Sequence, residues 1–137
     1  MVLNIRLMTP DGVYWDKPVD QIILPTTTGP IGILSGHASL ITALEIGVLR
    51  YQKDKDWSAI LTLGGGAIIK EDNVTILVSG VEEVVKDDTK AREAEAMLTE
   101  ATEALAKAET LREKIAASQN FKRANIRVEI HKFLESQ

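Results

Sequence analysis

Short hydrophobic runs with an alternating pattern fill the first 85 residues of this 137-residue chain. Turn-forming residues separate the runs, and Lys53-Asp54-Lys55-Asp56 is the clearest exposed hairpin tip. Many short β-branched runs spaced in this way are typical of an antiparallel sandwich or barrel. The clearest predicted strands are Leu3 to Leu7, Val19 to Leu24, Ala59 to Leu63 and Val74 to Val78.

The pattern changes near Val85. Residues 86 to 137 contain no glycine or proline and include ten alanines, a composition that favours helix. Asp87 or Asp88 can cap a helix that is predicted to run to about Ala117. Its apolar positions recur at steps of three and four residues, as expected for one helix face, at Ala94, Leu98, Ala101, Leu105 and Ala108.

A second helix is predicted after a break at Ser118-Gln119-Asn120, with Asn120 as its cap. Ile126, Val128 and Ile130 also alternate as in a strand, but an isolated strand would need a sheet edge to pair with. A short break between two amphipathic helices most often makes an antiparallel hairpin. The prediction is therefore an α+β fold. An antiparallel β-sandwich of about ten short strands spans residues 1–85, and an α-helical hairpin spans residues 86–137.

Composition excludes several classes of function. The chain has no cysteine and only two histidines, His37 and His131, so no metal site and no cofactor is expected. A net charge of -4 gives no basic field for nucleic acid. No apolar run approaches the roughly 18 residues that span a bilayer, and the amino terminus lacks a secretory pattern. We expect a partner that is another protein or a small ligand.

Ser35-Gly36-His37 raises the question of a hydrolytic site. A serine nucleophile needs a base within hydrogen-bonding reach and a group that orients the base, and this stretch lacks the Gly-x-Ser-x-Gly elbow. A turn in which Gly36 supplies an unusual backbone angle is the favoured reading. In this turn His37 caps or packs, and a buried, hydrogen-bonded histidine within the sandwich is one interpretation of it.

Two other motifs suggest chemistry that their context does not support. Gly64-Gly65-Gly66 leads into a predicted strand and not into the helix of a phosphate-binding loop, so a bulge or a close backbone crossing is expected. Acidic residues near the predicted helix start interact favourably with the helix dipole, which accounts for them without catalysis. These residues are Asp87, Asp88, Glu93 and Glu95.

Four segments together carry a family resemblance. They are TPDGVYWD (9–16), GPIGILSGHASLITALEIGVLR (29–50), GGGAIIKEDNVTILV (64–78) and AREAEAMLTEATEALAKAE (91–109). In this order they resemble the ε subunit of F-type ATP synthases over nearly the whole chain, closest to the cyanobacterial and chloroplast branch. Ser39 departs from the proline that many members carry after His-Ala, which affects the shape of that loop.

The resemblance implies a non-catalytic rotor subunit. The sandwich would bind the γ shaft and the ring of c subunits. Contacts are expected in a turn formed by Gly29, Pro30, Ile31 and Gly32, and at Gly36, His37 and Ser39. The hairpin would inhibit ATP hydrolysis through transient contact with the catalytic α and β subunits. The complex would lie at the cytoplasmic or stromal face of the thylakoid membrane, with this chain peripheral to it.

A basic group on the predicted second helix fits that inhibitory role. Arg123 and Arg127 are four residues apart and share a helical face. In the family, basic residues of this helix meet an acidic loop of the catalytic β subunits, which makes Lys122, Arg123, Arg127 and Lys132 the expected inhibitory face. An ordinary solvated face is an equally good reading of these four residues.

Some bacterial members of the family bind ATP through Ile/Leu-Asp-x-x-Arg-Ala. Asp87 and Ala91 match that motif, but Lys90 replaces its arginine and Lys86 its apolar residue. Further arginines of such members are replaced here by Met97, Ile130 and Leu134. Lysine lacks the planar fork of arginine, so ATP binding by the isolated chain is expected to be weak or absent when measured by calorimetry. A free-standing adaptor or nucleotide-sensing module is the alternative function.

Overall fold

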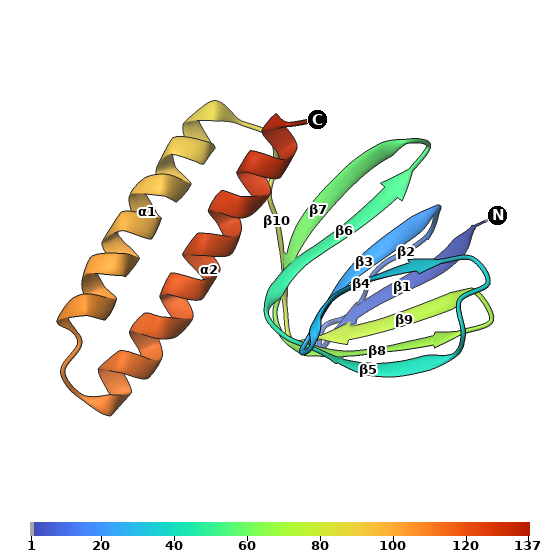
Figure 1. Cartoon of the computed structure of the whole chain (residues 1–137), viewed down its shortest axis with the longest axis horizontal. Coiled ribbons are helices and arrows are strands. Elements are labelled where there is room, and N and C mark those ends of the chain that lie inside the picture. Colours follow the sequence, from blue (N-terminus) through green and yellow to red (C-terminus); the bar gives the residue numbers. More distant parts are fainter. Residues whose placement is uncertain (1) are drawn as a thin grey trace. The chain divides into compact units, whose positions relative to one another are not determined.

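The computed structural model describes residues 2–137, in which ten strands precede two helices (Figure 1). The chain divides into two compact units, Met1–Glu83 and Val84–Gln137. The strands are β1 (Leu3–Thr9), β2 (Gly12–Val19), β3 (Gln21–Thr26), β4 (Gly29–Leu34), β5 (Leu40–Leu44), β6 (Gly47–Lys53), β7 (Asp56–Thr62), β8 (Gly65–Lys70), β9 (Asn73–Val78) and β10 (Val81–Glu83). The helices are α1 (Asp88–Lys107) and α2 (Leu111–Glu135).

The strands form one curled sheet in the order β10-β7-β6-β3-β5-β8-β9-β1-β2, and β4 pairs with β3. Every pairing is antiparallel except that of β1 with β9, which is parallel. The predicted hairpin tip is confirmed, since Lys53 pairs with Asp56 across two residues with positive φ, Asp54 and Lys55. Positive φ at both central positions is what a tight two-residue hairpin turn requires.

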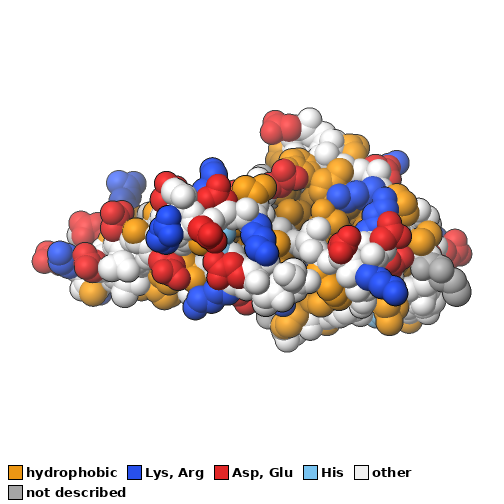
Figure 2. Space-filling view, turned by 90° about the horizontal axis from the view of Figure 1, so that it is seen from above, with side chains coloured by type: hydrophobic (Ala, Val, Ile, Leu, Met, Phe, Trp, Pro, Cys, Tyr) orange, Lys and Arg blue, Asp and Glu red, His pale blue; other side chains and the backbone are white. Residues whose placement is uncertain are grey.

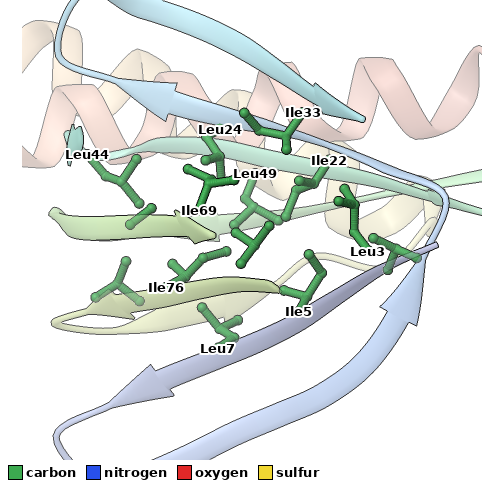
Figure 3. Packing of buried hydrophobic residues seen from close by; sticks show 14 of the residues in the cluster. Leu3, Ile5, Leu7, Ile22, Leu24, Ile33, Leu44, Leu49, Ile69 and Ile76 are labelled. Atoms are coloured by element: carbon green, nitrogen blue, oxygen red, sulfur yellow. The ribbon is translucent and has the colours of Figure 1, made fainter. Parts of the chain in front are cut away.

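Alternating side chains fill the interior of the curled sheet. Leu3, Ile5 and Leu7 are fully buried while Asn4 and Arg6 between them are exposed, as period-two alternation predicts. Figure 3 shows these side chains pointing toward those of Ile22, Leu24, Ile33, Leu49, Ile69 and Ile76 from other strands. The sandwich prediction is confirmed, and one contiguous apolar cluster holds its layers together.

The interior is closed between β2 and β6 by an aromatic pair. The ring centroids of Trp15 and Tyr51 are 5.3 Å apart. The Lys17 Nζ lies 4.4 Å from the Trp15 centroid and donates a 3.0 Å hydrogen bond to the Tyr51 hydroxyl. An ammonium placed between two rings gains cation–π attraction, so this cluster stabilises the closure of the sandwich.

Gly29 to Gly32 form a strand, so the expectation of a turn at these residues is wrong. Ile31 and Ile33 lie opposite Leu24 and Ile22 of β3, which places all four side chains on one face of the pair. Residues directly opposite each other in a sheet share a face, and burial of that face draws a segment rich in glycine and proline into the sheet.

The close backbone crossing expected at Gly64-Gly65-Gly66 is confirmed. A Cβ atom at Gly65 would overlap the carbonyl oxygen of Leu77 on the neighbouring strand β9. Only glycine permits that approach. The segment opens β8 and has no helix after it, so its glycines serve sheet packing.

The predicted break at Ser118-Gln119-Asn120 is wrong, because α2 runs through these residues. The chain leaves helical geometry at Ala108, and Thr110 caps α2 by accepting a 3.1 Å hydrogen bond from the Glu113 N–H. The Glu113 carboxylate in turn accepts from the Glu109 N–H at 3.1 Å. This reciprocal arrangement resembles a capping box, whereas the three polar residues are exposed on α2 and need no break.

The remaining helix predictions are confirmed. Asp87 caps α1 by accepting a 3.0 Å hydrogen bond from the Lys90 N–H, and residues 126–130 are helical. The predicted stripe forms the least exposed side of α1, with Ala94 buried and Leu98, Ala101 and Leu105 half-buried. Its last residue, Ala108, is the cap after the helix. The two helices pack on each other as a hairpin. Neither is long and apolar enough to cross a membrane.

Candidate interaction surfaces

The Ser35-Gly36-His37 loop is fastened to the turn between β8 and β9. The carboxylate of Asp72 accepts hydrogen bonds from the Ser35 hydroxyl at 2.8 Å and from the Gly36 N–H at 2.7 Å. The Asp72 carbonyl also accepts from the Asn4 N–H at 2.8 Å. Gly36 has a φ of 88°, which confirms the predicted unusual backbone angle. One turn residue thus joins three segments that are far apart in sequence.

These bonds explain why the loop is not a hydrolytic site. The Ser35 hydroxyl donates to a carboxylate, whereas a triad serine gives its proton to a histidine. The half-buried His37 has its Nδ1 2.6 Å from the carbonyl oxygen of Ala38. The Gly36 N–H, and then the Ser35 hydroxyl, hold the pKa of Asp72 below its ordinary value of 3.8, so the carboxylate stays ionised and acts as a hydrogen-bond acceptor.

We expect Asp72→Asn to destabilise the sandwich at neutral pH and to lose that effect in acid. Because the folded pKa lies below the unfolded one, the carboxylate contributes stability above the unfolded pKa and loses it as pH falls through the folded pKa. Urea unfolding midpoints of the two proteins should therefore converge at low pH. Asp11→Asn, at an exposed turn, is the control. A difference in urea midpoint between Asp72→Asn and the unsubstituted chain that is the same at every pH would contradict this explanation.

The residues expected to contact the shaft and ring lie in β4 and in the connection that follows it. Gly29, Pro30, Ile31 and Gly32 belong to β4, while Gly36, His37 and Ser39 lie in the connection 35–39. Pro30, Gly32, Gly36 and Ser39 are exposed, and the other three residues are half-buried. The structure thus gathers the predicted residues at one strand and its following loop.

A second surface escaped the sequence analysis and lies on the outward side of β5, β8 and β9. Ile41 is 79% exposed and pairs directly with Ile68, which is 49% exposed. Leu77 is 55% exposed and pairs with Gly66, two residues before Ile68 on β8. Residues two apart on a strand share a face, so the three side chains lie on the same outward side.

The row that contains Leu77 continues across β1 and β2. Met8 pairs with Leu77 on one side and with Val13 on the other, and Val13 is 58% exposed. We call Met8, Val13, Ile41, Ile68 and Leu77 the outer apolar face. Figure 2 shows exposed hydrophobic side chains among charged ones of both signs on the side that it displays. Contiguous exposed apolar surface on a soluble domain marks a docking site.

In the helical unit, two of the four predicted basic residues line a groove between α1 and α2. The groove has a volume of about 400 Å³. Arg123 and Arg127 are half-buried there, and the Arg123 Nε is buried without a hydrogen-bond partner in residues 2–137. The remaining lining is Met97, Glu100, Ala101, Ala104, Asn120 and Ala124.

The other two basic residues, Lys122 and Lys132, are exposed. At about 100° per residue, Lys132 lies on roughly the opposite side of α2 from Arg123. The four residues therefore divide into a groove pair and two solvent-facing lysines.

The remnants of the nucleotide motif have structural roles at the start of α1. The Asp87 carboxylate is engaged as the helix cap, Lys90 is exposed and Ala91 is half-buried. In residues 2–137 no three histidine or acidic side chains group together as they would to hold a metal ion.

An exposed apolar face on a β-sandwich that is joined to a helical hairpin is typical of proteins that bind other proteins. Residues 2–84 match the family model of the ATP synthase delta/epsilon chain, β-sandwich domain. A chloroplastic ATP synthase epsilon chain of Pylaiella littoralis is 48% identical over 134 residues, 98% of this chain and all of the relative. The epsilon chain of Thermosynechococcus vestitus is 45% identical, over 94% of each chain. The chain therefore belongs to the family of ATP synthase epsilon chains.

Solved structures share the fold at low sequence identity. A chain of the Euglena gracilis mitochondrial ATP synthase, in a structure of the OSCP, F1 and c-ring, matches 98% of this chain and 80% of its own length. Its TM-score is 0.71 at 21% identity. A chain of the Tetrahymena thermophila central stalk and c-ring has a TM-score of 0.63 at 18% identity. These likenesses support the sandwich and hairpin architecture.

Proposed function

We propose that this chain is a non-catalytic central-stalk subunit of a proton-transporting ATP synthase, which couples rotation of the c-ring to the catalytic head through γ. The observation that carries the proposal is the outer apolar face, which this chain presents to solvent. Burial of exposed isoleucine and leucine side chains against a partner stabilises the complex by roughly 25 cal/mol per Å² of apolar surface.

The outer apolar face is the surface that we assign to γ. Its five residues come from five different strands, so the rigid sandwich fixes their spacing. At its border, Arg6 and Asp16 form an exposed ion pair with a 3.2 Å N–O distance. An apolar centre with a polar rim is the usual anatomy of a protein interface. The same rigidity would let the sandwich transmit torque.

Contact with the c-ring is assigned to the connection 35–39 that follows β4. The bonds from Ser35 and Gly36 to Asp72 hold this connection in one shape. A preorganised loop loses little conformational entropy on binding. The exposed Gly36 and Ser39 would then meet the polar ends of the c subunits, while the half-buried His37 stays tied to the loop backbone.

The helical hairpin is the unit that we assign to inhibition of ATP hydrolysis. Arg123 and Arg127 line the groove against α1, so movement of α1 away from α2 would release both guanidinium groups. Bidentate pairing of arginine with carboxylate is short and directional, which suits capture of an acidic loop on the catalytic subunits. Lys122 and Lys132 would add attraction that salt weakens.

The nucleotide-sensing alternative has little support from the same residues. Asp87 is occupied as a cap, and Met97 occupies the groove where ATP-binding relatives carry an arginine. Weak or absent ATP binding stays a prediction for calorimetry. The complex to which the relatives belong is membrane-associated, and we place this subunit at its cytoplasmic or stromal face on the thylakoid membrane.

Co-purification tests this function. We expect the full chain, mixed with purified γ and c-ring, to elute from a size-exclusion column together with both partners. The stoichiometry should be fixed, because a rotor subunit has one set of partners. A heterogeneous set of partners captured from a lysate, with no complex formed on γ and the c-ring, would favour the adaptor alternative.

A further inference from the structure

Strand β4 has a partner along one edge only. Residues Gly29 to Leu34 pair with β3, and no other strand of residues 2–137 pairs with them. The edge of a sheet presents backbone N–H and C=O groups that are ready to bond another extended chain. The identity of those groups follows from the register.

The register shows which backbone groups point away from β3. The two-residue connection Thr27-Thr28 makes Thr26 and Gly29 the closing hydrogen-bonded pair. Hydrogen-bonded and non-hydrogen-bonded pairs then alternate, so Pro30, Gly32 and Leu34 direct their backbone groups outward. Pro25 and Pro30 lie opposite each other. They fit a non-hydrogen-bonded pair, because neither residue has an N–H to donate.

Four outward groups are therefore available at this edge: the Pro30 C=O, both groups of Gly32 and the Leu34 N–H. The Leu34 C=O already accepts a 3.1 Å hydrogen bond from the His37 N–H. Gly32 is exposed, and a Cβ atom there would meet nothing within 4 Å. An incoming backbone can thus reach this residue without steric hindrance.

The usual protections of an edge strand are incomplete here. Natural edges carry lysine, proline or a bulge that prevents pairing, but the segment Gly29 to Leu34 contains no charged residue and no bulge. Pro30 removes one donor near the start of the strand and leaves Gly32 and Leu34 open. Leu34 is 58% exposed, so the edge favours a neutral partner segment.

We propose that the open edge of β4 accepts an extended segment of the γ subunit, about five residues long and without charged side chains at its centre, as an added strand. The proposal rests on the function proposed above. Connection 35–39 joins β4 directly to β5, which carries Ile41 of the outer apolar face, so only five residues of chain separate the edge from the surface assigned to γ. Backbone pairing supplies affinity in such strand addition.

Amide hydrogen exchange of the full chain, free and bound to purified γ, tests the edge residue by residue. In the free chain, the Ile31 and Ile33 amides bond β3 and should exchange slowly, while those of Gly32 and Leu34 exchange fast. Binding of γ should slow Gly32 and Leu34 at least tenfold. A complex in which they still exchange fast overturns the strand addition and leaves the rotor role intact, whereas failure to form any complex overturns both.

Gly32→Pro provides a matched chemical test. It removes the outward N–H while keeping every bond to β3, and Pro30 shows that this phase of the strand accepts proline. We expect affinity for γ to fall about tenfold, and Gly32→Ala, which keeps the N–H, to stay within about twofold. Equal affinities of the two variants would overturn the proposal.

Slow exchange of the Gly32 and Leu34 amides in the free chain at high concentration would also overturn it, because it would indicate that two copies of the chain pair through this edge. The exchange experiment decides the question if the proline variant does not fold.

Discussion

Removal of residues 86–137 is expected to abolish inhibition of ATP hydrolysis while leaving attachment to γ intact. The chain forms two compact units, and the sandwich has its own closed apolar cluster, so a chain ending at Val85 should fold and bind. ATP hydrolysis by a reconstituted catalytic head with γ is the measurement, with no addition, with the full chain and with the shortened chain. Suppression by both chains would place the inhibitory element in the sandwich.

Within the full chain, the groove arginines are expected to account for much of that inhibition. Each arginine–carboxylate contact contributes about 1.5–3 kcal/mol, so Arg123→Ala combined with Arg127→Ala should weaken inhibition by about a hundredfold or more. Arg112→Ala, an exposed arginine near the start of the same helix, is the matched control. Unchanged inhibition by the double variant would favour the reading of a solvated face.

Ile41→Asp is expected to abolish binding to γ. Burial of an unpaired carboxylate in an apolar interface is strongly unfavourable, and affinity should fall by about a hundredfold or more. Ile68→Asp, directly opposite on β8, should behave in the same way. The measurement is γ binding by surface plasmon resonance.

The same variants should fold normally, because Ile41 is 79% exposed and surface substitutions change the free energy of unfolding by only about 0.5 kcal/mol. Leu111→Asp, at a residue 75% exposed on α2, controls for the added charge. If Ile41→Asp and Ile68→Asp bind γ with unchanged affinity, the outer apolar face is not part of the γ interface.

Local pattern predicted the strands and the class of fold because hydrophobic period and turn chemistry act over a few residues. The helix break was placed ten residues too late, since Ser118, Gln119 and Asn120 suggest a turn only by composition. The true signal, Thr110 with Glu113 three residues later, was present in the sequence as a cap pattern. Capping chemistry was thus a better guide to the helix boundary than the run of polar residues.

The surfaces were less predictable because they depend on pairing between distant segments. Asp72 fastens a loop that lies 36 and 37 residues away in sequence, and no local pattern marks such a partner. The adjacent apolar residues Ile68 and Ile69 do not reveal which one faces outward; pairing with β5 and β9 exposes the first and buries the second. The strand β4 was hidden because its glycines and proline resemble a turn.

The parallel pairing of β1 with β9 has a consequence for how the protein is made. Asn4 pairs with Asn73, so β1 leaves the ribosome long before β9, and its place in the sheet is complete only after β9 has been made. Contacts of such long sequence separation form slowly, whereas helices form within about a microsecond. Completion of the sandwich, rather than formation of the helices, therefore sets how soon a newly synthesised chain can join its complex.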